Sequence, residues 1–220
     1  MPQESVIEFG DFLVRVVVTD PPWYENCYIV QHSPSGEQIV VDPGSNPDRI
    51  AAAVLQNGGT VQSIMLTHGH PDHLGAVSAL QSLWSVPCRL HKAEAPLVQD
   101  IASYAMRRLG IDVTPPSSFE TFDDDAALSL GGVAFRAIPT PGHTPGGVCF
   151  VFDAGFVLTG DTLFNRGIGR TDLPGGDGSM LVRSITRLLQ SLPGHLMLYP
   201  GHGPGWTVAE AQPWWAAMVG

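Results

Sequence analysis

The chain has 220 residues, a formal net charge of -10 and only 11 lysines and arginines. So few basic residues argue against nucleic-acid binding as the main role and favour a small-molecule enzyme. The length fits one domain over residues 1–220, large enough to bury most of the surface that an unfolded chain exposes. The three cysteines, Cys27, Cys88 and Cys149, are far apart and form no C-x-x-C pair, so we expect core residues rather than disulfides or a cysteine zinc site.

The N-terminal segment is acidic before its first apolar run, at residues 12–18. Arg15 interrupts that run, which is too short to span a bilayer and makes a poor signal-peptide core. We therefore expect a cytoplasmic protein without a membrane partner.

Short β-branched runs predict strands along the whole chain. They lie at residues 12–18, 27–31, 38–42, 63–67, 86–91, 133–138, 148–152, 156–159 and 196–199. Helical patterns lie between or after them, at residues 49–57, 74–84, 93–109, 181–192 and 208–218. The helix at 49–57 has the clearest ends, because Asn46 can cap it, Pro47 suits its first position and Gly58 supplies a left-handed stop. This mixture favours two sheets between helices.

Four potential metal ligands, His68, His70, Asp72 and His73, occupy one six-residue window. Imidazoles and carboxylates are ligands of zinc and of non-haem iron. A buried strand precedes the window and a helical pattern follows it, so the four residues lie in a strand-to-helix turn. There the first two histidines can point into one pocket while Asp72 and His73 reach a second point nearby. One loop can therefore hold two metals.

Three further candidates, His143, Asp161 and His202, each lie in a glycine-rich segment. Turns at strand ends are where a rigid sheet can aim polar side chains into a shared pocket. The remaining histidines lack such a context, and we expect them to be surface or core residues: His32, His91 and His195.

The window from Thr67 to Leu74 matches the motif T-H-x-H-x-D-H, and His143, Asp161 and His202 follow it in order. This set resembles the metallo-β-lactamase superfamily, as do residues 26–30 and 41–44, which look like two of its early strands. The alternative, loop histidines satisfied by backbone carbonyls, is disfavoured in this context. The resemblance implies an α/β fold, the four-layer αβ/βα sandwich, with two mixed sheets between helices and metals at one edge.

The resemblance also implies a role for each residue. A first metal is expected on His68, His70 and His143, a second on Asp72, His73 and His202, and Asp161 between them; Asp72 is also the expected catalytic carboxylate. The cofactors are then two divalent ions, with Zn²⁺ favoured and Fe²⁺ as the alternative. Asp42 matches a carboxylate that braces the histidine loop, although an aspartate in a turn before Pro43 and Gly44 explains it almost equally well.

Two divalent metals bring a bridging water toward ionisation near neutral pH and polarise a carbonyl oxygen, which favours hydrolysis. The lactamases that bind zinc through a cysteine carry that cysteine where this chain has Asp161, so β-lactam cleavage is disfavoured. Residues 160–164 and 167–172 most resemble glyoxalase II-like thioester hydrolases. We therefore expect a metal-bound hydroxide to attack a small-molecule thioester such as S-lactoylglutathione.

Arg170 matches a basic residue through which glyoxalase II contacts glutathione, although pairing with Asp172 is an equally good interpretation. The chain ends 18 residues after His202 and carries no lysine or arginine there, unlike full-length glyoxalase II with its helical C-terminal domain. The shorter glyoxalase II-like hydrolases therefore match better, and glutathione specificity stays open.

Three alternatives to thioester hydrolysis remain at this point. The persulfide dioxygenases share the seven residues but use one iron on His68, His143 and Asp161. A lactonase and a metal-binding module without catalysis are less favoured. The sequence leaves the oligomeric state open.

Overall fold

The structure, a computed structural model, describes residues 4–124 and 126–220. Its first sheet has seven strands in chain order. The sheet is mixed, because the first four strands are antiparallel neighbours and the last four are parallel neighbours. The strands are β1 (Glu4–Phe9), β2 (Phe12–Val18), β3 (Asn26–His32), β4 (Glu37–Val41), β5 (Thr60–Met65), β6 (Cys88–His91) and β7 (Glu120–Phe122).

The second sheet has six strands in the order β15-β14-β11-β10-β9-β8. Only its β11 and β14 are parallel neighbours. A separate small hairpin pairs β12 (Leu163–Phe164) with β13 (Gly167–Ile168). The strands of the large sheet are β8 (Leu128–Leu130), β9 (Val133–Pro139), β10 (Val148–Phe152), β11 (Phe156–Gly160), β14 (Met197–Pro200) and β15 (Trp206–Thr207).

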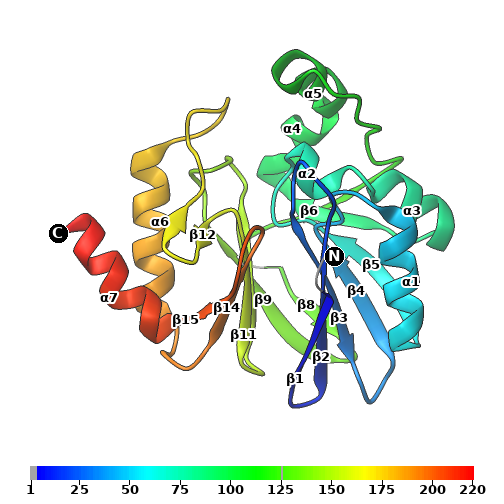
Figure 1. The fold of residues 1–220 in the computed structure, drawn as a ribbon, viewed down its shortest axis with the longest axis horizontal. Helices are drawn as coiled ribbons and strands as arrows, with labels where there is room; N and C mark the ends of the chain where they lie inside the picture. The colour runs from blue at the N-terminus through cyan, green and yellow to red at the C-terminus, as the bar shows by residue number, and fades with distance from the viewer. Residues whose placement is uncertain (1–3, 125) are drawn as a thin grey trace.

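Helices cover the outer faces of both sheets, which gives the predicted four layers (Figure 1). On the first sheet lie α1 (Pro47–Asn57) and α3 (Val77–Trp84), and on the second lie α6 (Gly178–Ser191) and α7 (Val208–Val219). The other helices are α2 (Pro71–Leu74), the 3₁₀ turn η1 (Lys92–Glu94), α4 (Ala95–Gln99) and α5 (Ile101–Leu109). Within residues 4–124 and 126–220, no helix has the length and apolar character needed to cross a membrane.

Three apolar clusters match these layers, one between the sheets and one under each pair of outer helices. Strand β10 illustrates why its sequence is continuously apolar. Phe150 and Phe152 pack between the sheets, whereas Cys149 and Val151 pack against the helices on the other face. A strand buried on both faces has no position for a polar side chain. All three cysteines are buried and unpaired, as predicted.

Two predicted helices are divided in the structure. The one expected at 74–84 begins earlier and splits into α2 and α3, because the Ala76 N–H leaves the helical pattern and donates to the Pro43 carbonyl at 3.0 Å. The one expected at 93–109 splits into η1, α4 and α5. The helix at 49–57 is confirmed and ends at Gly58 with φ 72°, but the Asn46 side chain accepts from the Asp20 N–H instead of capping it. The strands that were not predicted are β1, β7, β8, β12, β13 and β15.

The strand directions bring distant loops to one edge. Parallel neighbours end at the same edge, so the segments after β4 and β5 meet, as do those after β11 and β14. Strand β9 is antiparallel to β10, which is antiparallel to β11, so the segment after β9 reaches this edge too. The predicted ligand segments therefore lie in loops that follow strands at this edge. The exception is the part of the histidine window that lies in α2.

Candidate metal centre

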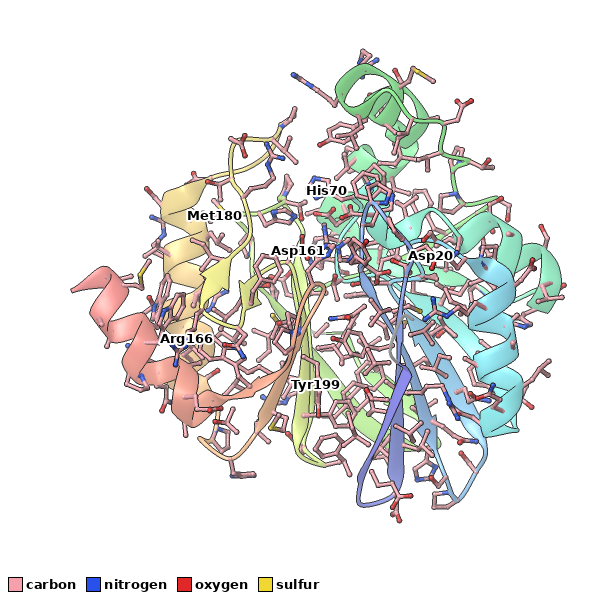
Figure 2. All side chains as sticks on the ribbon, in the orientation of Figure 1. Asp20, His70, Asp161, Arg166, Met180 and Tyr199 are labelled. Carbon is pink, nitrogen blue, oxygen red and sulfur yellow. The ribbon has the colours of Figure 1, made fainter. Side chains whose placement is uncertain are left out.

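The structure brings all seven predicted residues together at this edge. Figure 2 shows two of them, His70 and Asp161, near one another at the upper edge between the two sheets. Three sets of three residues have ligand atoms within 4.8 Å of one another, and one of these sets joins Asp42 to His68 and His73. We call His68, His70 and His143 the first group, and Asp72, His73 and His202 the second group.

In the first group, the ring nitrogens converge on one point. The His143 Nε2 atom lies 2.9 Å from His70 Nδ1 and 3.3 Å from His68 Nε2. The opposite nitrogens are occupied elsewhere: His143 Nδ1 lies 2.7 Å from the Arg170 carbonyl oxygen, and His68 Nδ1 lies 3.1 Å from Thr67 Oγ1. A hydrogen bond at one ring nitrogen selects the tautomer that leaves the other free for a metal.

In the second group, His202 Nε2 lies 3.3 Å from Asp72 Oδ2, and His73 Nε2 lies 3.9 Å from the same oxygen. The other nitrogen of His73, Nδ1, lies 3.0 Å from Asp42 Oδ2. One ring nitrogen of His73 therefore contacts the Asp42 carboxylate, and the other faces the Asp72 carboxylate.

Asp161 lies between the two groups. Its Oδ1 atom is 3.3 Å from His73 Nε2 and 3.7 Å from His202 Nε2, while its Oδ2 atom is 3.6 Å from His143 Nε2. Each carboxylate oxygen thus faces a different group, the arrangement that a bridging ligand requires.

Asp42 directly follows β4 and is buried. Its Oδ1 atom accepts from the Thr67 N–H at 2.7 Å and its Oδ2 atom from the Thr67 hydroxyl at 2.6 Å, in addition to the contact with His73. It also has the left-handed φ of 51° that suits an aspartate in a turn. The two interpretations from the sequence, a turn aspartate and a carboxylate that contacts the histidine loop, are therefore compatible. Asp42 lies in a turn and its carboxylate binds the start of the histidine loop.

The electrostatics of the two groups differ. Burial, together with the neighbouring His143, lowers the pKa of His70 to about 3; burial also holds the pKa of His68 well below its ordinary value. Burial acts on His73 in the same direction, but Asp161 and Asp72 outweigh it and hold the His73 pKa well above its ordinary value. His68 and His70 are therefore neutral and ready to bind a metal, whereas in the second group a proton on His73 balances the carboxylates.

The donor set fits metal ions. The His73 Nε2 and Asp161 Oδ1 atoms are buried without a hydrogen-bond partner in the described parts of the chain. Leaving such atoms unpaired costs about 1–3 kcal/mol each. Imidazole and carboxylate donors that converge in this way suit zinc or iron.

The other histidines lie outside this centre, as predicted. His32 Nδ1 pairs with the Ser35 hydroxyl at 2.9 Å, and His91 Nε2 lies 2.7 Å from Asp124 Oδ1. His195 is exposed.

Arg170 is exposed and forms two 2.7 Å contacts with the carboxylate of Asp172, which is the alternative that the sequence left open. Its predicted contact with substrate stays a prediction. Its backbone carbonyl has a role that the sequence did not reveal, because it accepts from His143 and orients that ring.

Two other residues near the centre were missed. Glu25 is completely buried with both carboxylate oxygens unpartnered among the described residues, and it forms a β-bridge with His202. The Tyr104 ring on α5 stacks on His70 with centroids 5.9 Å apart. No ligand motif contains either residue, so only proximity in the fold connects them with the site.

Glu25 permits a prediction about stability. Burial raises its pKa well above the ordinary value of about 4.3, and the nearby His73 offsets only part of this effect. Because the folded-state pKa is raised, stability is highest below the ordinary value and is lost as pH rises through the raised one. We expect the Tm of metal-free Glu25→Gln to equal that of metal-free wild type near pH 4. Near pH 8 we expect the Tm of the variant to be several degrees higher, because an unpaired buried group costs about 1–3 kcal/mol.

Calorimetry of both metal-free proteins across this pH range measures the difference. The exposed Glu8→Gln serves as the control, with no expected change at either pH. Equal Tm values for Glu25→Gln and wild type at high pH would contradict the prediction.

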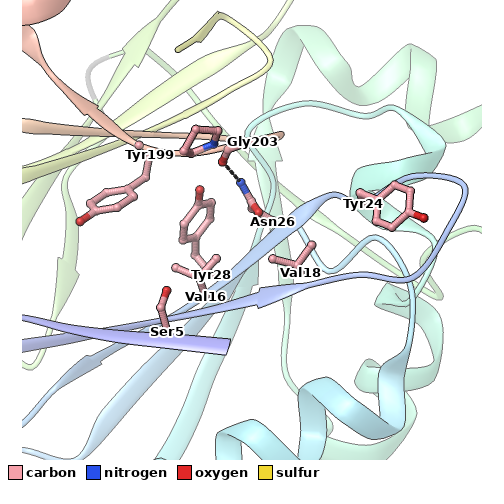
Figure 3. A pocket seen from close by; sticks show the side chains of 10 residues that line it. Ser5, Val16, Val18, Tyr24, Asn26, Tyr28, Tyr199 and Gly203 are labelled. Carbon is pink, nitrogen blue, oxygen red and sulfur yellow. Dashed lines mark hydrogen bonds between the residues drawn. The ribbon is translucent and has the colours of Figure 1, made fainter. Parts of the chain in front are cut away.

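A cavity of about 500 Å³ lies beside the centre, between the β1-β2 hairpin and the segment after β14 (Figure 3). None of the seven residues lines it. The Asn26 amide closes its wall by donating to the Pro200 and Gly203 carbonyls at 2.9 Å, on either side of His202. The cavity is therefore separate from the metal centre.

The chain matches the family model described as "Metallo-beta-lactamase superfamily" over residues 20–202. The chain belongs to this superfamily. It is 38% identical over 176 residues to the probable metallo-hydrolase YqgX of Bacillus subtilis, which covers 79% of this chain and 83% of the relative. These similarities identify this member of the metallo-β-lactamase superfamily as a metal-dependent hydrolase with a histidine-rich metal-binding site.

Two solved structures resemble this chain over most of their length. The di-iron-bound form of TTHA1623 is 36% identical, with a TM-score of 0.79 over 89% of this chain and 96% of that one. The BLEG-1 B3 metallo-β-lactamase is 29% identical, with a TM-score of 0.81 over 99% of this chain and 100% of that one.

Proposed function

We propose that this protein hydrolyses a small-molecule acyl thioester at a dinuclear metal centre. The first group would hold one divalent ion, the second group another, and Asp161 would bridge them. The observation that carries the proposal is the position of Asp161, whose two oxygens face different groups. A site for one metal would have no use for a second complete set of donors.

Two divalent ions held there would supply a polarised carbonyl and a water ionised near neutral pH. The residues of the chain orient this chemistry. Burial raises the pKa of Asp72, but His73 and His202 outweigh burial and keep the pKa well below its ordinary value. The Asp72 carboxylate, with 18% of its side chain exposed, is therefore ionised, so it can bind a divalent ion and accept a hydrogen bond that orients the attacking water.

A thioester suits this constellation because a thiolate leaves without needing a proton. The resemblance of residues 160–172 to glyoxalase II-like hydrolases also supports a thioester, with zinc as the favoured metal.

Arg170 is the proposed contact for an anionic part of the substrate. We expect Arg170→Ala to raise KM about 5-fold with little change in kcat, because an exposed contact of about 1 kcal/mol is equal in the ground and transition states. Steady-state kinetics with an anionic and a neutral thioester measure this effect, which should appear only with the anionic one.

Arg136→Ala is the matched control, since Arg136 makes a similar exposed pair with Asp153 at 3.0 Å. An unchanged KM in Arg170→Ala would assign Arg170 to loop structure through Asp172.

A second candidate is an iron-dependent persulfide dioxygenase. The similarity to a di-iron-bound protein favours iron as an alternative to zinc. A dioxygenase would use His68, His143 and Asp161 as two imidazoles and one carboxylate, leaving positions open for substrate and oxygen.

The two functions separate in one set of assays. Zinc-loaded protein should cleave S-lactoylglutathione or a simpler acyl thioester in the absence of oxygen, with a rate that rises with pH. The iron-loaded protein should consume no oxygen with glutathione persulfide. The opposite pair of results would replace the hydrolase proposal with the dioxygenase. Cleavage of a β-lactam but not of a thioester would point instead to the activity named for the BLEG-1 relative.

A further inference from the structure

Glu94 connects the two loops that carry the first group. It ends η1, just after β6, and is completely buried. Its Oε2 atom accepts from the Gly69 N–H at 2.8 Å, and its Oε1 atom accepts from the Gly146 N–H at 2.6 Å. Gly69 separates the first two histidines of the window, and Gly146 lies in the turn that follows His143. One side chain therefore holds both loops by their backbones.

Both glycines are packed too closely against η1 and α4 to carry a side chain. A Cβ atom on Gly69 would lie 2.7 Å from Val98 and 3.1 Å from the Glu94 carboxylate. A Cβ atom on Gly146 would lie 2.7 Å from the Glu94 amide nitrogen. The loops thus sit directly on the segment that bears Glu94.

The separation of these loops sets the geometry of the first group. The ligand atoms that meet at 2.9 and 3.3 Å come from residues 73 and 75 positions apart in the chain. A backbone hydrogen bond from Val148 to Thr67 joins the strand ends at 2.9 Å, and Glu94 joins the loops beyond it. The side-chain contacts of the second group run instead through Asp42, Asp72 and Asp161.

We propose that Glu94 is a positioning residue for the first metal, which sets the loop separation before the metal arrives. The inference rests on the ligand set of the proposed function but not on its substrate. Hydrogen bonds to a carboxylate are about twice as strong as neutral ones. Removing groups that orient metal ligands typically lowers metal affinity about 10–100-fold.

The test is a zinc titration of metal-free protein against a competing chelator, followed through the imidazole NMR signals of each group. Glu94→Gln keeps the shape but has only one acceptor oxygen for two N–H groups. We expect the Kd reported by the first group to rise about 10–100-fold and that reported by His202 to stay unchanged. Glu37→Gln is the control, because Glu37 accepts from the Gly131 N–H at 2.8 Å at the far end of β4.

Equal weakening of both groups, or no change in either, would overturn the inference, since a general loss of stability acts on both. If wild-type protein binds a single equivalent of metal, the dinuclear proposal fails. The inference about Glu94 then requires that the Kd of this one metal ion rises in Glu94→Gln, and an unchanged Kd would overturn it. Metal affinity is measured without substrate, so failure of the thioester proposal leaves this result unaffected.

A second measurement needs no variant. In folded, metal-free wild-type protein, we expect the Gly69 and Gly146 amides to exchange with deuterium slowly, because Glu94 holds both without metal. Rapid exchange of either amide would show that the loops are not held before the metal arrives, and would overturn the inference.

Discussion

Replacing Asp161 with Asn is expected to remove bound metal and activity together. An amide keeps the shape of the side chain but loses the charge and one of the two acceptor oxygens that face the two groups. We expect native protein to approach two metals per chain and Asp161→Asn to hold one or fewer. The fall in kcat/KM should be about 10³-fold or more, or roughly 4 kcal/mol of transition-state stabilisation.

Elemental analysis and thioester kinetics on the same samples measure both effects. Asp153→Asn is the matched control, because this aspartate is exposed and pairs with Arg136 away from the centre. Wild-type protein that holds a stable single equivalent under metal-replete conditions would contradict the dinuclear assignment and leave the fold intact.

Replacing His73 with Ala is expected to separate the two candidate functions. His73 belongs to the second group and lies 3.3 Å from Asp161, but it is not one of the three residues that an iron dioxygenase would use. A dinuclear hydrolase should therefore lose about 10²-fold or more in kcat, since the second ion helps to position the attacking water. A dioxygenase on His68, His143 and Asp161 would keep most of its oxygen uptake.

The comparison requires that the variant folds, because His73 is completely buried. Circular dichroism and Tm of the metal-free variant establish this, and the exposed His195→Ala is the control for removal of an imidazole. Thioester cleavage by His73→Ala at the wild-type rate would exclude a catalytic need for the second metal.

The sequence alone predicted the features that depend on residues close together in the chain. The histidine window was recognisable because its ligands are close in the chain and a buried strand precedes them. The apolar runs of β10 and β11 predicted strands because both faces of each are buried. The family resemblance added the order of the sandwich layers, which no local pattern contains.

Tertiary structure decided everything that depends on residues distant in the chain. It divided the predicted helix at 74–84, because the Ala76 N–H finds a partner in the Pro43 carbonyl. It also gave Glu94 its two backbone partners, 25 and 52 positions away. Such contacts follow from strand order and direction, which place loop ends side by side whatever their separation in sequence. No periodicity or motif around Glu94 records that placement, because its partners are backbone amides that every residue except proline possesses.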